Sequence, residues 1–299
     1  MKNKHSKEFR DRFLEILGSE PYRDINAIYF SGGVDSTTIL FALLELGRRP
    51  DLISFKQEGI DSKDIEVGMA IAKAYNLNYQ FCELRSDREG VVDDVQKVMS
   101  LIKHPLKTHI QCSIPFYHMS RELHKLGHTK AFSGIAADKI FGLNKKMNMM
   151  YSRCGEEELR RFRRTELYIN PKLSSFDIAL VSEDGGVELF DPYRDKQISE
   201  WMLNVPFKEL HTGRDKSIAV DAFAGYWAKD EGWYRPRDNL QIVSGIRELH
   251  DNLILKDDSV NSKDPLFGKA KSIIKLYDDM RQNVESKTTT SLEGFYDNG

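Results

Sequence analysis

The sequence predicts an α/β fold in which a parallel-sheet domain is followed by a mostly helical portion. Short apolar runs alternate with segments of helical periodicity over about the first 150 residues, and two of these runs end in glycine turns. After that point strand signals fade and helical periodicity dominates to about residue 284. Strands that alternate with helices imply right-handed crossovers and a parallel sheet covered on both faces.

The individual elements follow from side-chain type and spacing. Short runs rich in apolar and aromatic residues predict strands at residues 25–30, 51–55, 78–84 and 129–134. Apolar side chains at a spacing of three and four predict helices at residues 6–18, 35–46, 62–75, 87–102 and 113–126. We therefore expect an α/β domain at residues 1–150, a helical portion continuous with it at 151–284, and a flexible tail at 285–299.

Composition and cysteine usage indicate a globular protein of a reducing compartment. The chain has 299 residues, of which 40% are apolar and 30% charged, and a formal net charge of −2. This charge gives no sign of a nucleic-acid or membrane partner. Cys82, Cys112 and Cys154 form no C-x-x-C pair, and no apolar run approaches the ~20 residues of a membrane span. We expect a cytoplasmic protein, and its oligomeric state is left open.

The chemistry is expected at the first glycine turn, Ser31-Gly32-Gly33-Val34-Asp35-Ser36, between a strand and a helix. Gly32 and Gly33 permit positive φ and leave room for a ligand. The N-terminus of the following helix favours an anion, and two serine hydroxyls add donors. Asp35 would repel a phosphate directly, but it fits if a divalent cation lies between them. The Walker and dinucleotide glycine motifs are both missing.

Residues 31–36 resemble the pyrophosphate-binding loop (PP-loop) of the ATP pyrophosphatases, which cleave ATP between its α and β phosphates. Residues 133–142 read Ser-Gly-Ile-Ala-Ala-Asp-Lys-Ile-Phe-Gly. They resemble S-G-E-G-A-D-E-L-F-G-G in the synthetase domain of asparagine synthetases and β-lactam synthetases. Residues 187–196 resemble the same family's V-E-x-R-x-P-F-L-D-K.

Two shorter matches follow, in which residues 215–218 resemble E-K-x-I-L-R and residues 234–237 resemble R-x-K. The resemblance spans roughly residues 20 to 250, and we expect no counterpart of the family's glutaminase domain. It implies an ATP pyrophosphatase fold and an AMP-forming amide ligase that uses ATP and Mg²⁺. The substrates would be a small carboxylic acid and either ammonia or an amine.

The resemblance also implies a role for each matched residue. The pyrophosphate end of ATP would be held by Ser31, Gly32, Gly33 and Ser36. Mg²⁺ would be ligated by Asp35 and Asp138. The AMP portion would lie against Ser133 and Gly134. Charge that develops during the reaction would be stabilised by Lys216 and Arg237.

Several positions depart from the family pattern. Ile135 and Lys139 replace two glutamates, Arg237 replaces a lysine, and Val220 replaces an arginine. These changes are compatible with a different acceptor, a different nucleophile or a degenerate nucleotide-binding scaffold. A PP-loop enzyme that modifies a nucleobase or tRNA is a further alternative. Among the arginines at 153–164, Arg160 and Arg161 follow Glu156 and Glu157 at i,i+4 spacing, which favours a solvated helix face over an RNA-binding surface.

Overall fold

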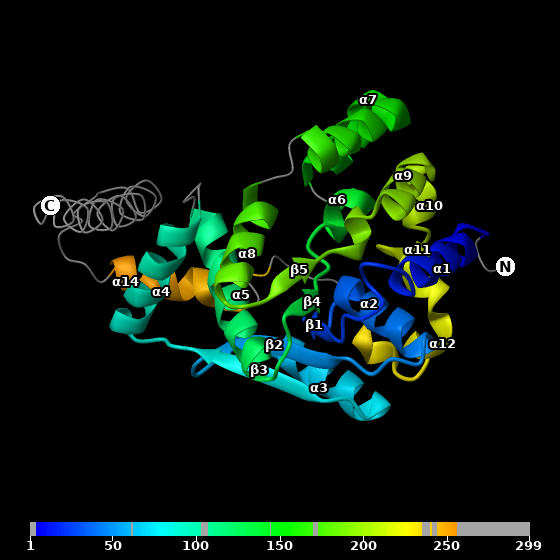
Figure 1. Cartoon of the computed structure of the whole chain (residues 1–299). Helices are drawn as coiled ribbons and strands as arrows, with labels where there is room; N and C mark the ends of the chain where they lie inside the picture. Colours follow the sequence, from blue (N-terminus) through cyan, green and yellow to red (C-terminus); the bar gives the residue numbers. More distant parts are fainter. Residues whose placement is uncertain are drawn as a thin grey trace, which may run out of the picture.

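The computed structural model describes residues 4–60, 62–102, 107–143, 145–169, 173–234, 240 and 244–255 (Figure 1). Its centre is a five-stranded, all-parallel sheet in the order β3-β2-β1-β4-β5. The strands are β1 (Ala27–Tyr29), β2 (Asp51–Gln57), β3 (Tyr79–Leu84), β4 (Lys130–Phe132) and β5 (Glu188–Phe190).

The strand order reverses at β1. The chain passes from β1 outward to β2 and β3, then returns to the other side of β1 for β4 and β5. Ile28 of β1 is therefore in register with both Leu52 of β2 and Phe132 of β4. In open α/β sheets, ligands bind outside the carboxyl ends of the strands where the order reverses. The fold thus places its expected ligand crevice between the ends of β1 and β4.

The strands supply two cores because successive side chains point to opposite faces of the sheet. Ile28 contributes to one core and its neighbours Ala27 and Tyr29 to the other. The core that contains Ile28 includes side chains from α1 (Lys4–Leu17), α2 (Val34–Glu45), α3 (Lys63–Tyr75), α6 (Ala137–Phe141), α7 (Lys145–Arg164), η1 (Thr165–Ile169), η2 (Pro192–Arg194), α9 (Lys196–Asn204), α10 (Phe207–Leu210), α11 (Ser217–Ala222), α12 (Ala224–Trp227) and η3 (Glu231–Trp233).

The opposite core lies under a smaller set of helices, which Figure 1 shows on the other side of the sheet from α1, α11 and α12. They are α4 (Arg88–Leu101), α5 (Lys107–Lys125), α8 (Leu173–Asp184) and α14 (Ile246–Leu255). Both faces of the sheet are therefore covered, as a parallel sheet requires.

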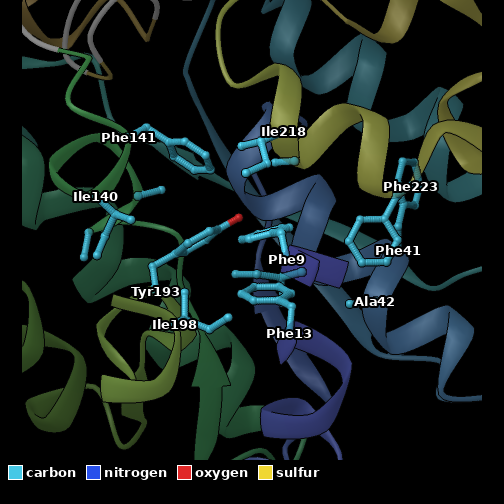
Figure 2. Packing of buried hydrophobic residues seen from close by; sticks show 14 of the residues in the cluster. Phe9, Phe13, Phe41, Ala42, Ile140, Phe141, Tyr193, Ile198, Ile218 and Phe223 are labelled. Atoms are coloured by element: carbon cyan, nitrogen blue, oxygen red, sulfur yellow. The ribbon is translucent and has the colours of Figure 1, made fainter. Parts of the chain in front are cut away.

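Aromatic side chains of the first core surround Tyr193 of η2. Figure 2 shows Tyr193 next to Phe9 and Phe13 of α1, with Phe141 of α6 close by. The rings of Phe13 and Tyr193 have centroids 5.2 Å apart, and those of Phe141 and Tyr193 are 6.0 Å apart. Segments far apart in the sequence thus pack around one residue.

The four predicted strands are confirmed, and each lies within two residues of its expected bounds. The expected helix at residues 113–126 is longer, since α5 begins at Lys107 and continues through Pro115. The fifth strand, β5, was not predicted, because only three residues form it within a region of helical periodicity. In the part of the chain that the structure describes, no helix has the length and apolar character needed to cross a membrane.

Candidate active site at the carboxyl ends of β1 and β4

The first glycine turn connects β1 to α2. Gly32 has φ +65°, and a Cβ there would lie 3.3 Å from the backbone O of Asp64 and from the backbone N of Gly68. Glycine is therefore required at this position for both its conformation and its close contact with α3. Gly33 is the N-cap of α2, and no side chain caps the helix there. The first turn of α2 thus presents backbone N–H groups at the end of β1, which suits an anion.

The two serines of this turn bond to each other and close it. Ser36 Oγ donates to the backbone O of Gly33 at 3.3 Å and accepts from the backbone N of Ser31 at 3.3 Å. The two hydroxyl oxygens are 3.2 Å apart. These bonds keep both hydroxyls beside the N-terminus of α2, where a phosphate would replace Gly33 O and Ser36 Oγ as the acceptor of their protons.

The second glycine turn follows β4 and touches the first directly. A Cβ on Gly134 would lie 2.8 Å from Cβ of Asp35 and 3.4 Å from the backbone N of Ser36. Only glycine allows the two turns to approach so closely. Ser133 donates its backbone N–H to Phe190 O of β5 at 2.8 Å, and its Oγ accepts from the backbone N of Ile135 at 3.3 Å.

Lys216 joins the acidic side chains of the two turns. Its Nζ donates to both carboxylate oxygens of Asp35, at 2.7 and 2.6 Å, and to Oδ1 of Asp138 at 2.6 Å. Burial alone would lower the pKa of Lys216, but the charges and hydrogen bonds of the two carboxylates outweigh it, so its pKa is raised. Lys216 is therefore a fixed positive charge, and the two carboxylates converge on one point.

This convergence fits the donor set that Mg²⁺ prefers. Mg²⁺ is bound by one or two carboxylates, with water and substrate phosphates as its other ligands. Asp35 and Asp138 are two carboxylates within hydrogen-bonding distance of a single cationic group. Among the residues that the structure describes, no set of three or more acidic, histidine or cysteine side chains is arranged for a metal ion. Mg²⁺ bound to these carboxylates would take the place of Lys216 Nζ between them, and it would depend on phosphate oxygens as further ligands.

Lys216 is held by His211 in an unusual backbone conformation. Its φ is +54°, in the left-handed region, and its backbone N–H donates to Nδ1 of His211 at 3.1 Å. His211 must then carry its proton on Nε2, which donates to Phe141 O at 2.8 Å. Burial lowers the pKa of His211, and this favours the neutral ring that the arrangement needs.

Asp191 and Tyr193 form hydrogen bonds that connect the two turns. Asp191 Oδ2 accepts from the backbone N of Ala136 at 2.6 Å, and Oδ1 accepts from the backbone N of Tyr193 at 3.1 Å. The Tyr193 hydroxyl donates to the backbone O of Asp35 at 3.0 Å. One short segment after β5 therefore positions both turns. Burial raises the pKa of Asp191 to about 6.

The structure brings together nearly all of the residues singled out in the sequence. Ser31, Gly32, Gly33, Asp35 and Ser36 lie in the first turn, Ser133, Gly134 and Asp138 in or just after the second, and Lys216 between them. Arg237 lies outside the described residues. Asp191, Tyr193 and His211 were missed as site residues; the first two lie in the family-like segment at 187–196, whereas nothing in the sequence marks His211.

The basic helix α7 pairs mostly with acidic neighbours. Arg160 and Arg161 form ion pairs with Glu157, and Arg164 with Glu200. The expected solvated face is thus confirmed for these arginines. Arg163 is an exception, because it is fully buried and its guanidinium group donates to the backbone O of Ile140 and of Met202. Arg163 lies on the side of α7 that faces the interior, so its side chain reaches the backbone of α6.

Comparison with known proteins identifies the domain. Residues 26–173 match the family model for asparagine synthase. Putative asparagine synthetase (glutamine-hydrolyzing) 1 of Methanocaldococcus jannaschii is 28% identical over 210 residues, which cover 68% of this chain and 37% of that protein. Asparagine synthetase B (glutamine-hydrolyzing) of Escherichia coli is 23% identical over 254 residues, which cover 77% of this chain and 42% of that protein. The chain thus spans about two fifths of the length of these curated relatives.

Among solved structures, NMN synthetase from Francisella tularensis is 12% identical, with 78% of this chain and 98% of that chain covered and a TM-score of 0.35. That similarity is too low to support an inference. The family match, in contrast, includes both glycine turns and Asp138, and ends before Lys216. Residues 26–173 therefore form an asparagine synthetase-like PP-loop domain.

Proposed function

We propose that this protein uses ATP and Mg²⁺ to adenylate a small carboxylic acid and then forms an amide with ammonia or an amine. AMP and pyrophosphate are the other products. The observation that supports this proposal is the convergence of Asp35 and Asp138 on Lys216 where the strand order reverses. That arrangement combines a phosphate-binding helix end, two possible metal ligands and a fixed positive charge.

The reaction has two steps. A carboxylate oxygen of the acid bonds to the α-phosphorus of ATP, while the bond to the bridging oxygen breaks and pyrophosphate leaves with the electron pair. The nitrogen nucleophile then attacks the acyl carbon, loses a proton, and AMP leaves. Holding the two substrates together supplies an effective molarity of about 10⁵–10⁸ M when their orientation is correct.

The residues of the chain bind and orient the nucleotide. Backbone N–H groups at the start of α2 and the hydroxyls of Ser31 and Ser36 hold the pyrophosphate end. Ser133 and Gly134 lie against the AMP portion. Lys216 stabilises the negative charge of the departing pyrophosphate. Mg²⁺ held by the two aspartates would neutralise phosphate charge and act as a Lewis acid.

The test is release of pyrophosphate from ATP and Mg²⁺ in the presence of a panel of carboxylic acids and amines, with AMP identified among the products. We expect release that depends on an acid and is lost in an Asp35→Asn variant. The matched control is Asp11→Asn, which changes an exposed aspartate of α1.

Two other outcomes would replace the proposal. Magnesium-dependent ATP binding without turnover against any acid would indicate a nucleotide-binding scaffold. Turnover that requires RNA instead of a small acid would indicate a modifying enzyme of the nucleobase or tRNA type.

A further inference from the structure

A cavity lies beside the second glycine turn. Its volume is about 140 Å³, and it is lined by Ile135, Ala179, Leu189, Asp191 and Arg194. These residues come from the second turn, α8, β5 and the η2 segment. At ~30 Å³ for each water molecule of the liquid, the cavity has the volume of about four or five water molecules. Its size therefore suits a small ligand or one end of a larger one.

Three of the lining side chains are apolar and two are charged, but the charges are not equivalent. Both oxygens of Asp191 already accept backbone N–H groups, those of Ala136 and Tyr193. The guanidinium group of Arg194, in contrast, makes no hydrogen bond or ion pair with any other residue that the structure describes, and it acts on Asp191 only through its charge, which partly offsets the rise that burial causes in the pKa of that carboxyl. Arg194 is half-buried, so an anion in the cavity could pair with it while partly shielded from water.

The cavity shares the second turn with the candidate nucleotide site. Ile135 and Ala136 follow Gly134, which touches Asp35 of the first turn. Asp191, a wall of the cavity, holds the backbone of Ala136. A ligand in the cavity would therefore lie next to the residues that we assign to the AMP portion of ATP, where the acceptor acid has to be.

The lining also departs from the pattern that residues 133–142 and 187–196 resemble. Ile135 stands where that pattern has a glutamate, and Arg194 stands where it has a leucine. One change removes a negative charge from the cavity and the other adds a positive charge. Both changes favour an anionic ligand with an apolar body.

We infer that this cavity binds the acceptor of the reaction, and that the acceptor is a short aliphatic monocarboxylic acid. Its hydrocarbon part lies against Ile135, Ala179 and Leu189, and its carboxylate pairs with Arg194. This inference rests on the proposed function, since it names the substrate class of the same site. Arg194 acts by binding and orienting the carboxylate beside the nucleotide.

Calorimetric titration with butyrate tests the inference, on the full chain both free and saturated with Mg²⁺ and α,β-methylene-ATP, which cannot be cleaved. We expect butyrate to bind the nucleotide-loaded protein, and butylamine, of equal length but opposite charge, not to bind. Arg194→Leu should weaken butyrate binding at least about tenfold, because the charge-assisted bond is lost. Arg153→Leu, which removes an exposed arginine of α7, should leave it unchanged.

A second pair of variants tests the apolar wall. Ile135→Glu places a negative charge in the cavity and should also weaken butyrate binding at least about tenfold, whereas Ile135→Leu should keep it within about twofold. The affinity for α,β-methylene-ATP, measured in every variant, reports correct folding.

The outcomes separate this inference from the proposed function. If nucleotide binds but butyrate does not, or if Arg194→Leu binds butyrate as wild type does, the inference is overturned and the ATP site stands. If nucleotide does not bind and butyrate still binds through Arg194, the cavity assignment stands and the proposed function fails.

Discussion

The two glycine turns both contribute residues to the candidate site at the ends of neighbouring strands, but they differ in the helix that follows and in the exposure of their aspartates. The first turn leads into α2, a helix of 12 residues whose positions from Ser36 to Leu43 are all buried. The second leads into α6, which has only 5 residues. The side chain of Asp35 is 25% exposed, whereas that of Asp138 is 64% exposed.

The first turn also agrees with the family's sequence pattern more fully than the second turn does. All six positions at residues 31–36 agree with the PP-loop pattern, but Ile135 and Lys139 replace glutamates near the second turn. A turn fixed by a long buried helix tolerates little change, because any shift disturbs a close-packed core. The comparison suggests that the first turn preserves the nucleotide chemistry and that the second determines which acceptor is used.

The largest expected effect comes from neutralising the two aspartates separately. We predict that Asp35→Asn lowers pyrophosphate release about 10³-fold and Asp138→Asn about 10²-fold. Asp35 should matter more because it is less exposed and both its oxygens bond to Lys216. Steady-state kinetics of both variants checks this ranking. Equal losses, or a larger loss for Asp138→Asn, would show that the turns are equivalent.

The next effect concerns the carboxylate that supports the second turn. Burial raises the pKa of Asp191 from 3.8 to about 6, so the folded state binds its proton more tightly than the unfolded state. Stability from this group is present below about pH 4 and is lost as the pH rises to about 6. At 1.36 kcal/mol for each pKa unit, the loss is about 3 kcal/mol.

Urea unfolding between pH 4 and pH 7 measures this dependence, with Asp191→Asn as the comparison. The difference in unfolding free energy between wild type and variant should change by about 2.5 kcal/mol over that range, since part of the effect already lies below pH 4. Other groups, including His211 with its lowered pKa, are common to both proteins and cancel. A difference that is constant with pH would mean that Asp191 is not the group that titrates.

The smallest effect tests the contact between the turns. Gly134→Ala would place a methyl group 2.8 Å from Cβ of Asp35, which forces the turns apart. We predict about tenfold weaker binding of α,β-methylene-ATP, in line with the 1–3 kcal/mol that overpacking typically costs. Gly225→Ala is the matched control, since a Cβ there meets nothing within 4 Å. Unchanged affinity in Gly134→Ala would show that the contact does not shape the site.

Periodicity and turn chemistry sufficed to predict the first four strands and the position of both turns. Strands such as β2 are long enough to show their pattern, and glycines at strand ends are visible in the sequence. β5 was missed because three residues carry too little pattern, and its partner β4 is more than fifty positions earlier. The proposed division near residue 150 stays a prediction.

The candidate site could be predicted as a set of residues but not as a geometry. Resemblance to family motifs pointed to Asp35, Asp138 and Lys216, yet no local pattern places Lys216 between the two aspartates. His211 was not predicted as a site residue, because its role depends on hydrogen bonds to the backbone of Lys216 and Phe141. These bonds fix its tautomer and have no signature in the sequence. Arg163 was expected on the surface because charged side chains usually lie there. Its burial against α6 is a tertiary contact that the sequence does not show.

The bond between Lys216 and Asp35 also has a consequence for how the protein is made. The two residues are 181 positions apart, and a growing chain lengthens by about 5–20 residues each second. Asp35 is therefore synthesised about 10 to 40 seconds before its lysine. During that interval the carboxylate must be balanced by water and free cations, and the finished site is assembled only when the segment that carries Lys216 folds back onto the two turns.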